Sequence, residues 1–124
     1  MEAFPIVEPV FQAIHSRMGR GDDWSVFNRL TPLERAIYAT RVIEGQIDNG
    51  GWYAVFYNNT DHWVDPAIQG YELLGLPEYA EHLRRVRAIG FGEDSPEPIG
   101  EAIDAEYFRL SGSEEARARA LLPN

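Results

Sequence analysis

The segment that most restricts the fold is residues 31–59. It begins with a nearly complete signal for the start of a helix, and the helix is then interrupted within the same segment. Thr31 and Glu34 stand where a capping box requires them, and Pro32 occupies the first helical position. At about 100° per residue, apolar side chains then share one face of the helix: Leu33, Ala36, Ala39, Ile43 and Ile47. A second face carries the polar residues Glu34, Arg41, Glu44 and Asp48. The pattern predicts an amphipathic helix whose alanines let a neighbouring helix approach closely.

This helix is interrupted at Asn49, Gly50 and Gly51, just before an aromatic-rich segment. A glycine inside a helix costs roughly 1 kcal/mol relative to alanine. At a helix end, by contrast, glycine and asparagine adopt the left-handed conformation at little cost. The next segment, residues 52–59, again separates into two helical faces, with Trp52 on one of them. We therefore predict a tight corner between two helices.

The rest of the chain contains shorter helical patterns separated by proline and glycine. Helices are predicted at about residues 5–18, 24–30, 65–74, 77–89 and 99–110, followed by a last short helix capped by Ser113. In the helix at 99–110 we expect Ile99, Ile103, Tyr107 and Leu110 to face the core. No convincing strand alternation or long linker interrupts these patterns. The sequence thus predicts one all-α domain over residues 1–124, a bundle of about six or seven short helices.

Negative charge is concentrated in the middle of the chain. The formal net charge is -9, and residues 42–108 hold thirteen acidic residues against three arginines, whereas residues 1–41 are neutral overall. An acidic field of this kind repels nucleic acid and attracts basic surfaces. An acidic coat that only keeps a small domain soluble is the alternative explanation.

Several of these acids recur at helical spacing and form a candidate partner-binding surface. Helical carboxylates one turn apart stand about 5–6 Å from each other, and duplex DNA carries one phosphate per about 1.7 Å of axis. We expect such rows to face a basic protein, for example a DNA-binding protein, with no direct contact to nucleic acid. The predicted surface consists of Glu44, Asp48, Glu78, Glu81, Glu97, Glu101 and Asp104. Glu97, Glu101 and Asp104 are expected opposite the buried face of their helix.

Three short motifs resemble a known family. They are N-G-G-W at residues 49–52 with the F-Y-N that follows at 56–58, A-I-Q-G-Y-E-L-L-G-L, and A-I-D-A-E-Y-F-R-L. Together they resemble a family of small helical bacterial domains of unknown function that is partly named after a DNA-mimic protein. The resemblance extends over about residues 31–110. It implies an all-helical fold and a protein-binding role. Whether this role includes a homodimer stays open.

A pocket at the corner is the rival interpretation. Amide side chains and exposed backbone N–H groups beside aromatic walls would suit a neutral polar ligand or a peptide. The protein would then be a small-ligand-binding or enzymatic domain with its pocket at the corner of residues 49–59. Amides near a corner more often cap loose backbone groups. The residues of this predicted pocket are Gln46, Asn49, Gly50, Gly51, Trp52, Asn58 and Asn59. A third alternative is an apolar interface through exposed aromatics such as Trp24 or Trp63.

The chemical inventory favours a non-enzymatic role. The chain has no cysteine and no lysine, and no serine lies in a Gly-x-Ser-x-Gly motif. His62 lies near Asp61 and Asp65, and His82 follows Glu78 by one helical turn, but neither group completes a metal site. We therefore expect no catalytic residue, metal or cofactor.

The remaining basic cluster and the ends of the chain yield two further expectations. Arg84, Arg85 and Arg87 are predicted to pair with neighbours such as Glu81 rather than to bind nucleic acid. No apolar run approaches the roughly 20 residues that cross a bilayer, and the first residues carry acids where a secretory signal needs bases. We therefore expect a cytoplasmic protein that does not bind membranes.

Overall fold

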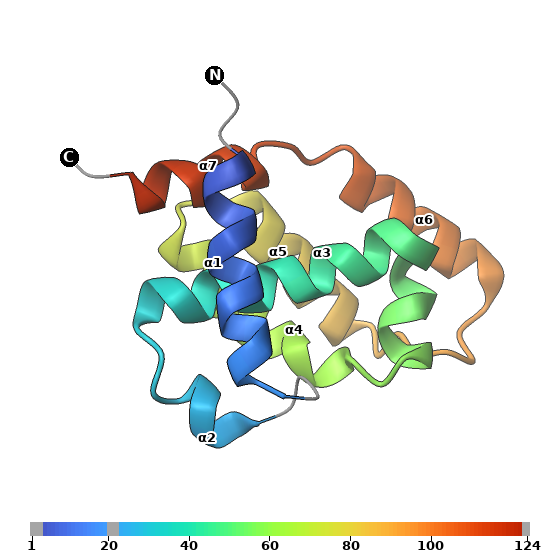
Figure 1. The fold of residues 1–124 in the computed structure, drawn as a ribbon. Coiled ribbons are helices and arrows are strands. Elements are labelled where there is room, and N and C mark those ends of the chain that lie inside the picture. Colours follow the sequence, from blue (N-terminus) through green and yellow to red (C-terminus); the bar gives the residue numbers. More distant parts are fainter. Residues whose placement is uncertain (1–3, 20–22, 123–124) are drawn as a thin grey trace.

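The computed structural model describes residues 4–19 and 23–122, and these residues form an all-α fold without strands. These residues contain seven α-helices, and Figure 1 shows α3 running through the middle of the molecule. None of these helices combines the length and the apolar character needed to cross a bilayer. The helices are α1 (Phe4–Arg17), α2 (Trp24–Phe27), α3 (Pro32–Tyr57), α4 (Val64–Leu73), α5 (Pro77–Ala88), α6 (Glu97–Phe108) and α7 (Ser113–Leu121), with a short 3₁₀ turn, η1 (Asp61–Trp63), before α4.

Helix α3 begins as the sequence predicts. Thr31 Oγ1 accepts a hydrogen bond from the Glu34 backbone N–H at 3.1 Å, and the Thr31 N–H donates to the Glu34 carboxylate at 2.9 Å. Helix α4 packs closely against the face of α3 that carries Ala36. A Cβ at Gly70 of α4 would lie only 2.9 Å from Ala36 Cα. Helices α1 and α6 also pack against α3, so the central helix is covered from several directions.

The predicted corner divides α3 into two helical segments. Gly50 has φ -161° and ψ 23°, and Gly51 has φ 71° and ψ -173°, so both leave the helical conformation. The positive φ at Gly51 is strained for any residue with a side chain. Beyond the corner, Trp52 and Val55 are fully buried, whereas Tyr57 is 74% exposed. The corner thus changes the direction of the chain so that Trp52 and Val55 pack into the core.

Three local expectations from the sequence were wrong. Gly112, not Ser113, is the N-cap of α7, and Ser113 turns its hydroxyl into the core. In α6, Tyr107 is buried and Ile103 and Leu110 pack against the core as expected, but Ile99 is 42% exposed and the neighbouring Gly100 is buried instead. Trp63 is only 2% exposed, since it packs among Trp24, Phe27 and Tyr38, and it offers no external interface.

Candidate acidic interface

The corner in α3 is held by an acid from α6. The backbone N–H of Trp52, the first residue after the two glycines, donates to Asp104 Oδ1 at 2.8 Å. Asp104 therefore acts as an N-cap supplied from another helix, where a negative charge also complements the helix dipole. A Cβ on Gly51 would lie 2.4 Å from Asp104 Oδ2, so the second glycine makes room for this carboxylate.

Four further acids lie near the same corner. We call the set of Glu93, Asp94, Glu97, Glu101 and Asp104 the acidic face; these residues come from α6 and the loop before it. Tyr53 is its centre: Tyr53 Oη donates to the Ser95 carbonyl at 2.7 Å, and Gly100 is so close that a Cβ there would meet the Tyr53 ring at 2.4 Å. Burial raises the pKa of Tyr53, and the charges of Glu97, Asp104 and Glu101 raise it further.

The acidic face lacks local counter-charges. In residues 4–19 and 23–122, none of its five carboxylates lies within ion-pair distance of an arginine or histidine. Glu93, Asp94, Glu97 and Glu101 are exposed, and Asp104 is half-buried. Asp104 is consequently not opposite the buried face of α6, as expected from the sequence, but at its edge. The other two acids of the predicted row, Glu97 and Glu101, point outward.

A second group of acids is neutralised by arginines, and we call it the ion-paired face. Arg85 lies 2.7 Å from Glu106 and 3.6 Å from Glu81, and Arg84 lies 3.8 Å from Glu81. Two more pairs connect α5 to α4, namely Arg84–Glu72 and Arg87–Asp65. The expectation that these three arginines pair with acids is confirmed. Glu81 is exposed, as predicted, but two guanidinium groups share its charge.

Glu44 does not belong to any acidic surface, and this corrects the prediction. It is 6% exposed, and Arg117 of α7 donates to both of its oxygens at 2.9 Å. Tyr71 Oη and Ser113 Oγ complete its hydrogen bonds at 2.6 and 3.0 Å. The polar side of α3 is buried here because α7, from the far end of the chain, covers it and supplies the opposite charge.

The two other predicted acids, Asp48 and Glu78, are exposed. Neither forms an ion pair within the described part of the chain. Burial raises the pKa of Asp48, and the nearby Glu44 carboxylate adds to this rise. The charges of Arg41 and Arg117 act in the opposite direction and lower the pKa of Asp48.

The residues of the predicted corner pocket do not converge. Gln46, Asn58 and Asn59 line a hollow of about 650 Å³ beside α1, where Asn58 Nδ2 donates to Gln46 Oε1 at 2.7 Å. Gly50 lines a different hollow of about 340 Å³ with Tyr53, Tyr57, Glu93 and Asp94. Asn49 is exposed, Gly51 is half-buried beneath Asp104, and Trp52 is fully buried. The hydrogen bond from Asn58 to Gln46 thus connects the end of α3 to the segment before the corner.

Trp52 takes part in a buried hydrogen-bond chain that the sequence did not reveal. Its Nε1–H donates to His82 Nε2 at 2.9 Å, and His82 Nδ1 lies 2.5 Å from Glu106 Oε1. With Nε2 accepting, Nδ1 carries the proton and donates to the carboxylate. Burial lowers the pKa of His82, which keeps the ring neutral. No group of three or more potential metal ligands occurs among the described residues.

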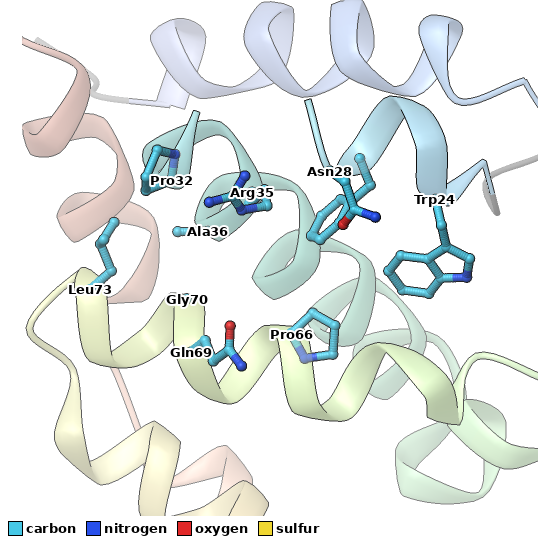
Figure 2. A pocket seen from close by; sticks show the side chains of 10 residues that line it. Trp24, Asn28, Pro32, Arg35, Ala36, Pro66, Gln69, Gly70 and Leu73 are labelled. Carbon is cyan, nitrogen blue, oxygen red and sulfur yellow. The ribbon is translucent and has the colours of Figure 1, made fainter. Parts of the chain in front are cut away.

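A further hollow of about 320 Å³ lies between α2, the start of α3 and α4. Figure 2 shows Trp24 and Leu73 at its opposite ends, with Gly70 and Gln69 between them on α4. Trp24 is 37% exposed and Leu73 53% exposed, and Arg35 Nη1 donates to the Leu30 carbonyl at 2.6 Å. Of the two tryptophans considered for an apolar interface, only Trp24 thus remains accessible.

The described residues thus form a small all-α domain with an Asn-Gly-Gly corner and, beside it, a group of acids without an ion pair in that part of the chain. Residues 28–122 match the DMP19-like protein family, and the chain belongs to that family. The match includes the corner, the acidic face and all of α7, so it extends beyond the resemblance seen in the sequence at both ends. No curated protein and no solved structure matches the chain significantly.

Proposed function

We propose that this protein binds a basic DNA-binding protein through its acidic face, in place of DNA. The observation that carries the proposal is the gathering of five carboxylates around Tyr53 without an arginine or histidine at ion-pair distance in the described residues. Membership of the DMP19-like family is compatible with this role.

The arrangement suits a DNA-binding partner that recognises the negative charge of DNA and not its base sequence. Glu97 and Glu101 are one helical turn apart on a rigid helix, and Glu93 and Asp94 extend the charge along the preceding loop. The backbone that carries Glu97 and Glu101 is held by packing, since Gly100 brings α6 directly onto Tyr53. A helix already in place keeps the two residues at helical spacing without a partner, which lowers the entropic cost of binding.

Competition with DNA tests the proposal. Basic bacterial DNA-binding proteins are bound to a fluorescent DNA duplex, and the anisotropy of the duplex is followed while this protein is added. We expect displacement of the duplex from at least one of them, with an affinity that falls steeply as salt rises from about 50 to 200 mM, because exposed charges are screened.

The control is the double variant Glu97→Gln/Glu101→Gln, which keeps the shape of α6 and removes two exposed charges. We expect it to displace the duplex much more weakly. Absence of displacement at low salt, or equal displacement by the variant, would exclude a role for this face in replacing DNA.

A further inference from the structure

A separate cleft of about 280 Å³ lies where α3, α5, α6 and α7 meet. Its wall contains three aromatic rings and its rim contains three acids that have no ion pair in the part of the chain that the structure describes. The loop from α6 to α7 closes one side. The residues that the argument uses are Asp48, Tyr79, Tyr107, Phe108, Glu114 and Glu115.

Phe108 is the aromatic residue of the cleft whose ring a cation can reach from solvent. The rings of Tyr107 and Phe108 meet edge-on, with centroids 5.1 Å apart, and Tyr79 meets Tyr107 edge-on at 6.1 Å. Tyr79 and Tyr107 are each only 5% exposed, whereas Phe108 is 58% exposed at the mouth. Aromatic faces within about 6 Å attract guanidinium and ammonium groups.

The hydroxyl of Tyr107 has no hydrogen-bond partner among the described residues, although the side chain is buried. Burial raises the pKa of Tyr107 well above its usual range, and the charges of Glu44 and Asp48, which line the same cleft, raise it further. The hydroxyl is therefore neutral and has free lone pairs. Among the described residues, Arg117 Nε is the buried side-chain atom that lacks a hydrogen-bond partner. The Tyr107 oxygen is instead open to the cleft, where it can accept a hydrogen bond from a ligand that donates.

The charge of the cleft identifies the kind of donor. Glu44 is already satisfied by Arg117, Tyr71 and Ser113, so it contributes no free acceptor. Asp48, Glu114 and Glu115 are exposed at the rim. A ligand that fits must carry positive charge, several N–H donors and a flat face for the rings.

We propose that this cleft binds an arginine side chain of the basic partner. A guanidinium group is planar, carries five donors and stacks on aromatic rings, whereas a lysine ammonium is a compact and strongly hydrated charge. The guanidinium would donate to Tyr107 Oη and to rim carboxylates while it lies against Phe108. This inference rests on the proposed function for the source of the arginine, but the cleft is a different surface from the acidic face.

Titration of the isolated protein with N-acetyl-arginine amide tests the proposal, with the citrulline analogue as a neutral control of nearly the same shape. Two-dimensional ¹H–¹⁵N NMR follows the backbone signals of Gly112, Ser113 and Phe108. We expect saturable shifts with the arginine compound and none with the citrulline compound. Equal shifts with both compounds, or shifts scattered over all acidic surfaces, would overturn the proposal.

Two pairs of variants locate the interaction. Tyr107→Phe removes only the hydroxyl and should weaken binding about tenfold, whereas Tyr57→Phe, on an exposed tyrosine outside the cleft, should leave it unchanged. Asp48→Asn should weaken binding, and the matched Glu78→Gln should not. Unchanged affinity in Tyr107→Phe would contradict the assignment.

This experiment can fail independently of the proposed function. Binding of the arginine compound without displacement of DNA from any basic protein would retain the cleft and exclude the DNA-like role. Displacement of DNA without binding of the arginine compound would retain that role and exclude the cleft.

Discussion

The acidic face and the ion-paired face carry similar numbers of carboxylates and differ in what surrounds them. On the ion-paired face, Arg84, Arg85 and Arg87 lie against acids of α4, α5 and α6. On the acidic face, the acids surround Tyr53 and none of them has a guanidinium at ion-pair distance within the described residues. One region has therefore neutralised its charge internally, and the other leaves its charge without an ion pair in the described residues.

The comparison shows that a net charge of -9 does not by itself indicate a binding surface. Surface ion pairs contribute little to stability, about 0–1 kcal/mol each, but they remove charge from the outside field. An exposed acid affects a partner only where the fold leaves it unpaired. Glu44 is the extreme case, because burial with Arg117 converts an acid into part of the core.

The largest effect is expected when the buried acid loses its partner. Arg117→Met leaves Glu44 charged and buried, which costs about 3–5 kcal/mol of unfolding free energy. Urea unfolding at pH 7 measures the loss. The exposed Arg119 of the same helix supplies the control, since Arg119→Met should change stability by less than about 0.5 kcal/mol. Similar values for both variants would show that the Glu44–Arg117 pair is not a structural element.

Gly51, in the corner that supports the acidic face, should not tolerate a side chain. Gly51→Ala requires a positive φ and places a Cβ against Asp104, so we expect a loss of about 1–3 kcal/mol. Gly92→Ala meets open space and has no positive φ, and it should change stability far less. Thermal unfolding followed by circular dichroism compares the two variants, and equal melting temperatures would contradict the proposed strain.

Within the acidic face, one acid should matter for stability and its neighbours should not. Asp104→Ala removes the cap on the Trp52 N–H and should cost about 1 kcal/mol. Glu101→Ala, on the same helix and exposed, should cost less than about 0.5 kcal/mol. Urea midpoints of the two variants measure the difference, and an equal loss would place Asp104 among the purely external charges.

The smallest effect concerns pH. Burial holds the pKa of His82 below its usual 6.5, so the unfolded chain takes up a proton before the folded protein does. Stability should therefore fall as pH drops below about 6.5. Urea midpoints at pH 7.5 and 5.5 measure this dependence. His82→Gln should reduce it and His15→Gln should retain it; a dependence that persists in His82→Gln would assign it to another group.

Local signals in the sequence were sufficient to predict the helices and the corner. The capping residues Thr31 and Glu34 lie within one turn of each other, and the backbone requirement at Gly51 is a property of that residue alone. Such features depend on short-range geometry, which spacing along the chain records directly.

Whether an individual acid is buried, paired or exposed depends on residues that are far away along the chain. Helical periodicity placed Glu44 on a polar side of α3, but Arg117 is 73 residues away and no local pattern connects them. Asp104 shows the same limit, since its role is set by the Trp52 N–H, 52 residues earlier. Sequence reasoning could thus identify rows of acids, and only the packing decided which acids stay available.

A matched pair of triple variants tests the central claim most directly. Glu93→Gln/Glu97→Gln/Glu101→Gln and Asp65→Asn/Glu72→Gln/Glu81→Gln each remove three formal charges, the first set from the acidic face and the second from the ion-paired face. In the DNA-displacement assay at low salt, we predict a loss of affinity of about tenfold or more for the first and less than about twofold for the second. Equal losses would show that total charge, and not its arrangement, determines binding.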